Sequence, residues 1–370
     1  MVINLNYRNL CGEKVFPLGF GCMRFPMKDG TPDIPETKKI IRHAIDEGLN
    51  YIDTAYFYHD GKSEEILSEV LADGYREKVF LATKMPLVYV KCEEDFDRIF
   101  NEQLERLKTN YIDFYLLHAV SLERWDNLVL KFGLIEKMQK LKCEGKVKHI
   151  GFSFHDTVDA FKRIVTEYDG CDLCQIQLNY IDVNNQAGME GLEFAYKKGL
   201  SVVIMEPLLG GKLASPGKEV METLGKNKTA AKHGFDFLWD RKEISVVLSG
   251  MSSAEQVEEN LKSAKECKVG MLSEKEKEAY VLAKKMYDSK KPISCTACNY
   301  CMPCPVGIDI PGIFKFSNDA ADKNYFEAKS DYISLVSPAD KCVSCKACES
   351  QCPQKLQISK LMKLIKESYE

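Results

Sequence analysis

The 370-residue sequence predicts an α/β protein: a barrel of eight parallel strands, each followed by a helix, and then a small α-rich domain. Two observations predict this. Residues 15–270 repeat, eight times, a short apolar run, a polar turn and a segment with helical spacing, and eight cysteines fall within residues 295–352. Eight such units in about 255 residues suit a (β/α)8 TIM barrel, because a doubly wound sheet would carry a glycine-rich phosphate loop after its first strand.

The eight apolar runs are rich in Val, Ile, Leu and Phe and lack clean polar alternation, as expected of parallel strands covered on both faces. They span residues 16–21, 51–55, 79–85, 112–118, 147–154, 173–179, 201–207 and 244–250. Amphipathic helices are predicted at residues 35–48, 93–108, 122–143, 157–168 and 254–267. Gly48 is placed to end the first of them, and Asp156 to cap the start of the fourth.

The chain divides into a barrel (residues 1–270), a lysine-rich linker helix (271–291, helical from Ser273 to Lys291) and a cysteine-rich domain (292–370). A mildly helical stretch, Ile313 to Val336, joins the two cysteine-rich halves of that domain.

Composition argues against two classes of partner. The 51 Lys and Arg residues nearly balance 55 Asp and Glu without a long basic block, so no nucleic-acid partner is expected. No apolar run approaches the roughly 18 residues needed to cross a bilayer, and the first ten residues lack the layout of a secretory signal. We therefore expect no membrane association and a cytoplasmic location.

Polar side chains at the carboxyl ends of three predicted strands are candidate catalytic residues, because active sites of such barrels lie at that end. They are Asp53 with Tyr58 just beyond it, Lys84, and His118. Each alone also has a structural explanation. Together they form an acid–base set, because an Asp carboxylate holds a Lys ammonium near the Tyr hydroxyl and that cation lowers the phenol pKa from roughly 10.

At this point the chain resembles the aldo-keto reductase family. The motifs that carry the resemblance recur in family order over about residues 10–265 and are LGFG (18–21), YIDTAYFY (51–58), GKSE (61–64), ATK (82–84), DFYLLH (113–118), GFS (151–153), QLNY (177–180), EPLLGGKL (206–213) and EQVEEN (255–260). The resemblance implies that Tyr58 is the proton donor, that Lys84 and Asp53 tune it, and that His118 orients the substrate carbonyl.

The resemblance also implies an extended NAD(P)H across the barrel mouth. Its nicotinamide amide would lie near Ser153 and Gln177, its pyrophosphate under the loop 208–213, and its adenosine against residues 250–253. The implied contacts are Gly21, Met23, Ser153, Gln177, Met205, Pro207, Leu208, Gly210, Lys212, Gly250, Ser252, Gln256, Glu259 and Asn260.

Several positions depart from the family pattern. Phe154 stands where Asn is frequent, and Met205 where many members have an aromatic that stacks on the nicotinamide, so a sulfur contact is expected instead. Gly250 and Gln256 replace the Lys and Arg of members that prefer a 2′-phosphate, which leaves Lys212 as a candidate phosphate cation. Because those cations are replaced, we expect weak discrimination between NADH and NADPH, or a preference for NADH.

Two similar cysteine motifs, CTACNYCMPCP and CVSCKACESQCP, form an internal duplication. Three cysteines at i, i+3 and i+6 followed by Cys-Pro resemble the two-cluster ferredoxin layout, in which the Cys-Pro thiolate ligates the other cluster, although the first motif is one residue short of the usual spacing before Cys304. We assign one [4Fe-4S] cluster to Cys295, Cys298, Cys301 and Cys352, and a second to Cys342, Cys345, Cys348 and Cys304. The alternative, two structural zinc sites, would not explain the repeated proline.

The predicted function is reversible NAD(P)H-dependent reduction of an aldehyde or ketone to an alcohol, with a small-molecule carbonyl substrate. Clusters move one electron and nicotinamide moves a hydride, so direct exchange between them needs a flavin-like intermediary. The cysteine domain is therefore an electron relay to a redox partner protein, a redox sensor, or a structural cap. The alternative function is an electron-transfer or regulatory protein whose barrel binds nucleotide with little turnover.

Overall fold

The computed structural model describes residues 6–289, 293–320, 325–335 and 337–369. Contacts between residues divide the chain into two compact units. The barrel unit comprises Met1–Leu208 and Lys226–Lys277, and the second unit comprises Leu209–Gly225 and Glu278–Glu370.

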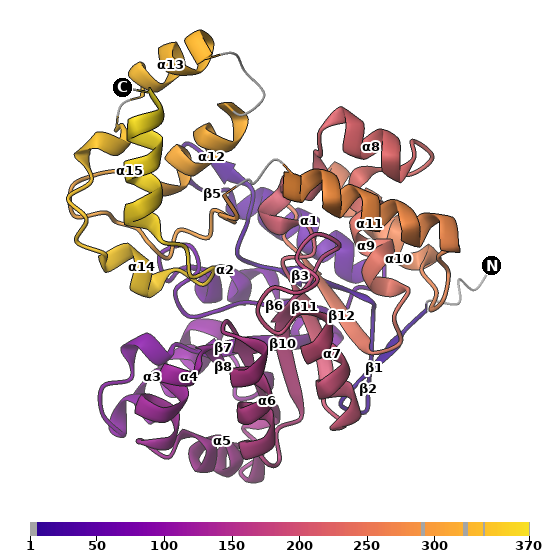
Figure 1. Cartoon of the computed structure of the whole chain (residues 1–370). Coiled ribbons are helices and arrows are strands. Elements are labelled where there is room, and N and C mark those ends of the chain that lie inside the picture. The colour runs from indigo at the N-terminus through magenta and orange to yellow at the C-terminus, as the bar shows by residue number, and fades with distance from the viewer. Residues whose placement is uncertain (1–5, 290–292, 321–324, 336, 370) are drawn as a thin grey trace. The chain divides into compact units, whose positions relative to one another are not determined.

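The barrel unit is a closed ring of eight parallel strands, as predicted (Figure 1). In order around the ring they are β3 (Leu18–Gly21), β6 (Tyr51–Asp53), β7 (Phe80–Met85), β8 (Ile112–Val120), β9 (Val147–Phe154), β10 (Leu173–Gln177), β11 (Ser201–Met205) and β12 (Ile244–Ser249). Val247 of β12 pairs with Leu18 of β3 and closes the ring. Gly151 of β9 is required there, because a Cβ would stand 2.2 Å from the Leu173 carbonyl oxygen.

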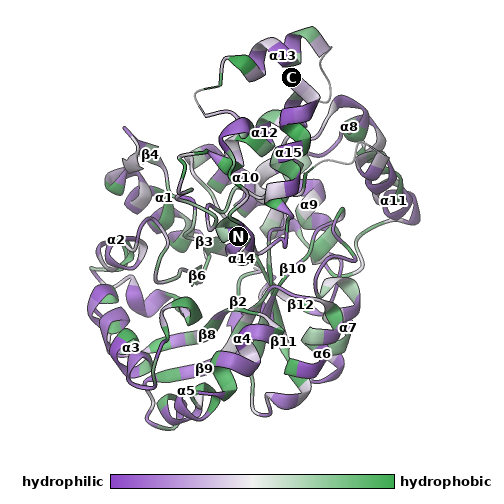
Figure 2. Ribbon diagram, turned by 60° about the vertical axis from the view of Figure 1, so that its left-hand side comes forward, coloured by the Kyte–Doolittle hydropathy of each residue, from purple (hydrophilic) through white to green (hydrophobic). Residues whose placement is uncertain are grey.

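The helices that follow the strands each bury part of their surface. They are α1 (Ile34–Asp46), α2 (Ser63–Val70), α3 (Glu94–Leu107), α6 (Val158–Glu167), α7 (Gly188–Lys197), α9 (Ala230–Trp239) and α10 (Ala254–Glu266), with short 3-10 turns η1 (Arg76–Lys78) and η2 (Leu87–Tyr89). In α1, Ile40, Ile41, Ala44 and Ile45 are buried, the spacing of one helical face. In Figure 2 strands β8 and β9 are mostly hydrophobic, whereas the outer helix α3 is largely hydrophilic.

Two predicted helical features are wrong in detail. The helix expected at 122–143 is three pieces: α4 (Leu122–Arg124), the wide turns of η3 (Trp125–Leu130) and α5 (Leu134–Cys143). Gly133 interrupts it with a left-handed backbone of φ +58°. Asp156 does not cap α6; Thr157 accepts the Ala160 N–H instead, and the Asp156 carboxylate accepts the N–H of Leu122.

A hairpin that the sequence analysis missed precedes the barrel. Strands β1 (Arg8–Leu10) and β2 (Glu13–Val15) pair antiparallel, and Leu10 and Val15 join the core cluster that contains Tyr51 and Leu173, the first residues of β6 and β10. The hairpin therefore closes the end of the barrel at which the strands begin. A second small hairpin, β4 (Met27–Lys28) and β5 (Thr31–Pro32), follows β3.

The second unit is helical, with η4 (Leu209–Ala214), α8 (Lys218–Leu224), α12 (Ile310–Ala320), α13 (Tyr325–Ile333), η5 (Ala339–Lys341), α14 (Ala347–Gln351) and α15 (Ile358–Tyr369). Its apolar core includes Ile310, Phe314, Tyr332, Ile358 and Met362. The predicted lysine-rich helix is α11 (Glu274–Ser289), along which the division between the units falls. The ends of two predicted helical stretches, Lys291 and Val336, lie outside the described residues.

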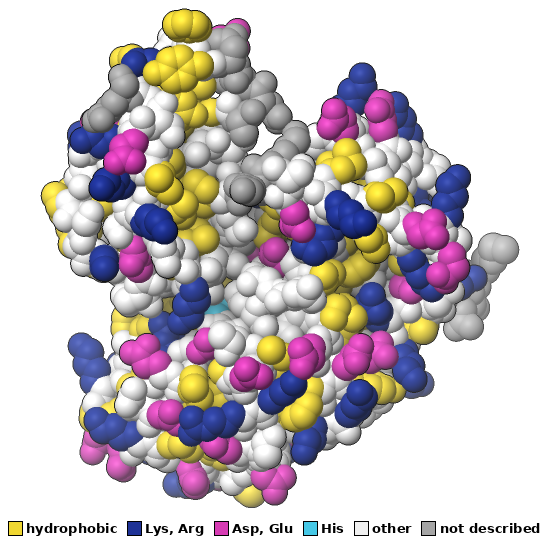
Figure 3. All heavy atoms as spheres, in the orientation of Figure 1, with side chains coloured by type: hydrophobic (Ala, Val, Ile, Leu, Met, Phe, Trp, Pro, Cys, Tyr) yellow, Lys and Arg dark blue, Asp and Glu magenta, His cyan; other side chains and the backbone are white. Residues whose placement is uncertain are grey.

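The surface carries no large patch of one charge on the barrel face that Figure 3 shows, over α3, α5, α6 and α7, where Lys and Arg alternate with Asp and Glu. Within the described parts of the chain, no helix is both long enough and apolar enough to cross a lipid bilayer.

Candidate active site and cysteine cavities

The four predicted catalytic side chains lie together at the carboxyl ends of β6, β7 and β8. The Lys84 ammonium donates to Asp53 Oδ1 at 2.7 Å and to the Thr54 carbonyl oxygen at 2.7 Å, and lies 5.2 Å from the centre of the Tyr58 ring. The Tyr58 and His118 ring centres are 6.0 Å apart. Lys84 is completely buried, whereas Tyr58 keeps 9% of its surface exposed. Tyr58 is thus buried, but less completely than Lys84.

Burial sets the charges of this group. Burial raises the pKa of Asp53 above its ordinary value, and the Lys84 ammonium opposes that rise. The pKa of His118 is held well below its ordinary value by burial and by the nearby Lys84, His155 and Arg124. His118 is therefore a neutral imidazole at neutral pH, able to donate one hydrogen bond without carrying a charge. Phe57 stacks on the imidazole at 4.7 Å and fixes the orientation of the ring.

A second buried polar network holds the strand that carries Lys84. Glu64 Oε1 accepts from the Thr83 hydroxyl at 2.6 Å and from Gln103 Nε2 at 2.7 Å, and Gln103 Nε2 also reaches the Lys84 carbonyl oxygen at 3.1 Å. Tyr115 donates to Gln103 Oε1 at 2.7 Å. The sequence motif GKSE contains Glu64. Nothing in the sequence indicated that Gln103 would bond to Glu64, or that Tyr115 would bond to Gln103.

The residues predicted to meet the nicotinamide end lie at neighbouring strand ends. Ser153 Oγ accepts the Ala119 N–H at 2.8 Å, so its own hydroxyl hydrogen is left to point elsewhere. Gln177 Nε2 donates to Asp182 at 2.9 Å, and Gln177 Oε1 accepts from Gln186 at 3.3 Å. These two contacts fix the Gln177 amide in place.

Three other predicted contacts lie close by. Gly21 is the last residue of β3 and pairs with Asp53 of β6. Met23 lies two residues further along the chain, and its side chain is half-buried. Met205 ends β11, where its sulfur lies 3.8 Å from Gln175 Nε2. The Gln175 Oε1 atom is buried and has no hydrogen-bond partner among the described residues, so a donor from a bound molecule would satisfy it.

The residues predicted at the adenosine end surround the start of α10. Gln256 Oε1 accepts the Ser252 N–H at 2.9 Å, and Ser253 caps the helix. Asn260 donates to Ser249 Oγ at 3.2 Å, and the Glu259 carboxylate accepts from the Thr229 hydroxyl.

Sequence analysis missed Arg24 at this end. A Cβ on Gly250 would stand only 3.2 Å from Arg24 Cβ and 3.3 Å from its Cδ, so the Arg24 side chain lies across Gly250. The aliphatic stem of an arginine from the segment after β3 therefore packs against the position where no cation was expected. Only the closure of β12 against β3 brings these segments together, so no local pattern could have shown it.

The predicted pyrophosphate loop has an unusual backbone. Glu206, Leu209, Gly210 and Gly211 all adopt positive φ values, between +48° and +95°. Non-glycine residues in this region are strained and are held there by surrounding contacts. Pro207 and Leu208 belong to the barrel unit, where Leu208 packs against Gly234 of α9. Gly210 and Lys212 belong to the second unit, where Lys212 Nζ donates to the Ile293 carbonyl oxygen at 2.9 Å.

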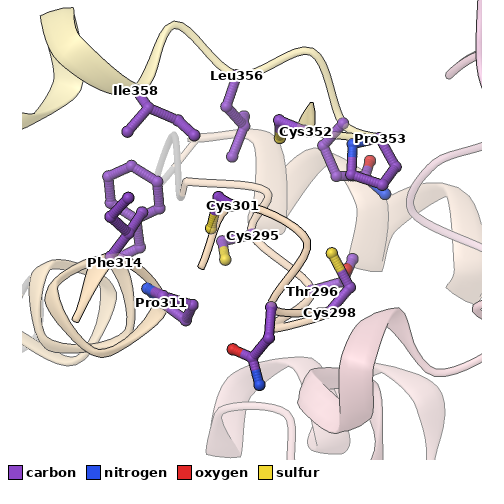
Figure 4. Close-up of a pocket in the computed structure, with 13 residues that line it drawn as sticks. Cys295, Thr296, Cys298, Cys301, Pro311, Phe314, Cys352, Pro353, Leu356 and Ile358 are labelled. Atoms are coloured by element: carbon purple, nitrogen blue, oxygen red, sulfur yellow. The ribbon is translucent and has the colours of Figure 1, made fainter. Parts of the chain in front are cut away.

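Eight cysteines line two cavities of the second unit, four in each. The first cavity is lined by Cys295, Cys298, Cys301 and Cys352 (Figure 4). The second is lined by Cys304, Cys342, Cys345 and Cys348. Each cavity thus combines three cysteines of one motif with the Cys-Pro cysteine of the other, the crossed arrangement predicted from the sequence.

The donor set fits iron–sulfur clusters. The pKa of the Cys301 thiol is raised to about 12 by burial and by its neighbours Cys298, Cys295 and Cys352, so the four sulfurs are close enough to interact. Among the described residues, no three acidic, His or Cys side chains converge as closely as a single metal ion requires. Four sulfurs spread around a cavity suit a cluster, whose corner irons each take one thiolate.

Sequence comparison decides the family. The model of the aldo/keto reductase family matches residues 17–279, and a 4Fe-4S dicluster domain matches residues 294–356. The chain belongs to the aldo/keto reductase family. This aldo/keto reductase is 28% identical over 282 residues to L-galactose dehydrogenase of Arabidopsis thaliana, a match covering 69% of this chain and 86% of the relative. It is 30% identical over 219 residues to 6-dehydroglucose reductase of Novosphingobium aromaticivorans, covering 55% and 69%.

Solved structures share the barrel fold of this aldo/keto reductase. The holo form of an aldo-keto reductase from Bacillus halodurans has a TM-score of 0.65 and 23% identity, and covers 76% of this chain and 96% of its own. An aldo/keto reductase of Klebsiella pneumoniae in complex with NADP and acetate has a TM-score of 0.62 and 23% identity, covering 76% and 95%. In both, the match spans nearly the whole of the solved chain.

Proposed function

We propose that this aldo/keto reductase reversibly reduces an aldehyde or ketone to an alcohol with NAD(P)H. The observation that carries the proposal is the buried Asp53–Lys84 pair beside Tyr58. A barrel that only bound nucleotide would gain nothing from an ammonium placed beside a phenol.

Each residue then has one task. When bound, NAD(P)H supplies the hydride that the carbonyl carbon accepts. Tyr58 donates its hydroxyl proton to the carbonyl oxygen, and the Lys84 ammonium stabilises the phenolate that remains. Asp53 holds that ammonium in place, and the neutral His118 donates a hydrogen bond that orients the carbonyl oxygen.

The same proposal assigns the nucleotide contacts. Ser153 and Gln177 would hold the nicotinamide amide, since both are fixed by hydrogen bonds at neighbouring strand ends. The loop 208–213 would hold the pyrophosphate through its N–H groups. Residues 250–253 and the start of α10 would hold the adenosine, where the positive end of the helix dipole favours phosphate.

For the second unit we propose two [4Fe-4S] clusters, one in each cysteine cavity. Eight cysteines in two sets of four supply every thiolate that two clusters require. Thiols must stay reduced to ligate iron, which supports a cytoplasmic location. A carbonyl compound is the proposed small-molecule partner, and we expect no nucleic-acid partner, since both charges are interspersed on the barrel face that Figure 3 shows.

The proposal is tested by turnover. Anaerobically purified protein is expected to oxidise NADPH or NADH when mixed with members of a panel of aldehydes and ketones, and to reduce NAD(P)⁺ with the matching alcohols. Oxidation or formation of NADPH or NADH is measured from the absorbance of the nucleotide. Protein that binds nucleotide but turns over none of the panel would instead favour a regulatory or electron-transfer role.

Cofactor selectivity is expected to be weak. Gln256→Arg should move the ratio of kcat/KM values toward NADPH, because a guanidinium binds the 2′-phosphate and each 1.4 kcal/mol of new contact gives about tenfold. Arg24→Gln should move the ratio the other way, because it removes the positive charge from a side chain whose stem packs against Gly250. Steady-state kinetics with one carbonyl substrate measures both changes. A wild-type preference for NADPH of roughly a hundredfold would contradict the expected weak discrimination.

A further inference from the structure

The proposed pyrophosphate loop is built into the same compact unit as the cysteine cavities, although it directly follows barrel strand β11 in the chain. Two contacts anchor it. A Cβ on Gly210 would stand 2.5 Å from the Thr296 carbonyl oxygen and 2.9 Å from Thr296 Cα, so the two main chains touch. Lys212 Nζ donates to the Ile293 carbonyl oxygen at 2.9 Å. Both partners belong to the segment that begins the first cysteine motif.

Thr296 lies between two cysteines of the first cavity. Figure 4 shows it on the same loop as Cys295 and Cys298, and only 3% of its surface is exposed. The next residue, Ala297, has a positive φ and its N–H donates to the Cys295 sulfur at 3.4 Å. The path of the main chain at Thr296 is therefore set by where the neighbouring thiolates are held. Metal coordination orders such ligand loops, and loss of metal releases them.

We propose that the first iron–sulfur cluster positions the nucleotide loop through Thr296, so that affinity for NAD(P)H depends on the integrity of that cluster. This inference rests on the proposed function of the loop 208–213. Thr296 acts as a positioning residue: it touches Gly210, and Gly210 and its neighbours meet the pyrophosphate. Thr296 lines the first cavity, whereas the lining of the second comes from residues 304–310, 342–348 and 358–362 and does not include Thr296.

Coupling between two sites is reciprocal. If the first cluster favours the loop conformation that binds nucleotide, then bound nucleotide stabilises the first cluster by the same factor. Couplings of this kind typically change affinity by about 5–150-fold. NADPH should therefore slow the release of iron from the first site to a chelator, while leaving release from the second site unchanged.

The test compares two matched cysteine variants. The dissociation constant for NADPH is measured by anaerobic fluorescence titration for wild type, for Cys298→Ser, which removes the first cluster, and for Cys345→Ser, which removes the second. Cys298→Ser should weaken binding by about fivefold or more, and Cys345→Ser by much less. Equal affinities in wild type and Cys298→Ser would overturn the inference. Failure of wild type itself to bind NADPH would instead overturn the proposed function.

A second pair of variants avoids the cysteines. Gly210→Ala and Gly211→Ala both place a methyl group at positive φ, but only the Cβ added at residue 210 would overlap Thr296, whereas nothing lies within 4 Å of a Cβ at residue 211. We expect Gly210→Ala to abolish the protection of first-cluster iron by NADPH, and Gly211→Ala to retain it. The chelator assay reads this directly, and equal protection in both variants would show that Thr296 does not carry the coupling.

Discussion

Replacing Tyr58 by phenylalanine is expected to lower kcat by about 10²–10⁴-fold while leaving NADPH binding nearly intact, because a positioned general acid contributes that much and no predicted nucleotide contact is lost. The phenylalanine ring fills the same space beside Lys84 and His118, so the change removes the proton donor alone. The measurement is single-turnover and steady-state reduction of one carbonyl substrate, with the NADPH dissociation constant obtained separately.

Tyr51→Phe provides the matched control. Tyr51 is another fully buried tyrosine, at the start of β6, and its hydroxyl has no hydrogen-bond partner among the described residues. Loss of that hydroxyl should leave turnover close to the wild-type value. Equal turnover in wild type and Tyr58→Phe would contradict the assignment of Tyr58 as the acid.

Anaerobically prepared protein is expected to be brown, with close to eight irons per chain, and Cys298→Ser should lose about half of them. The crossed cavities make a sharper prediction. Cys298→Ser combined with Cys352→Ser should lose no more iron than either change alone, because both residues line the first cavity. Cys298→Ser combined with Cys304→Ser should lose nearly all, because Cys304 lines the second.

Iron and acid-labile sulfide analysis of each variant measures this, with visible absorbance as a check. If the Cys298 and Cys304 double variant kept half its iron, the two residues would share a site and the crossed assignment would be wrong. A colourless protein containing zinc would overturn the cluster assignment itself.

The barrel could be predicted from the sequence because parallel strands buried on both faces leave apolar runs that local inspection detects. The hairpin β1–β2 could not, since three-residue strands are too short to show alternation. The prediction of one helix at 122–143 was wrong because the sequence has helical spacing both before and after Gly133. Only the positive φ of Gly133 shows that the helix is interrupted there.

The candidate site shows the same division. Asp53, Lys84 and His118 could be predicted because each lies at the end of a strand, and the topology of a closed barrel brings strand ends together. Arg24 could not, because its contact with Gly250 joins segments more than two hundred residues apart. The donation from the Lys212 ammonium to the carbonyl oxygen of Ile293 could not be predicted either, because Ile293 lies outside the motif that contains Lys212. The expectation that Lys212 meets phosphate stays a prediction.

The crossed cysteine cavities also constrain when metal can be inserted during biosynthesis. Ribosomes make the chain from its N-terminus, so Cys295, Cys298 and Cys301 emerge about fifty residues before Cys352, the fourth wall of their cavity. Cys304 is likewise synthesised before Cys342, Cys345 and Cys348, the other three cysteines of the second cavity. Under the proposed crossed assignment, neither half of the duplication completes a four-thiolate site alone, so a ribosome-bound or truncated chain that stops before residue 342 would contain the barrel strands but no complete site. We therefore expect iron loading to be a late step that follows synthesis of nearly the whole chain.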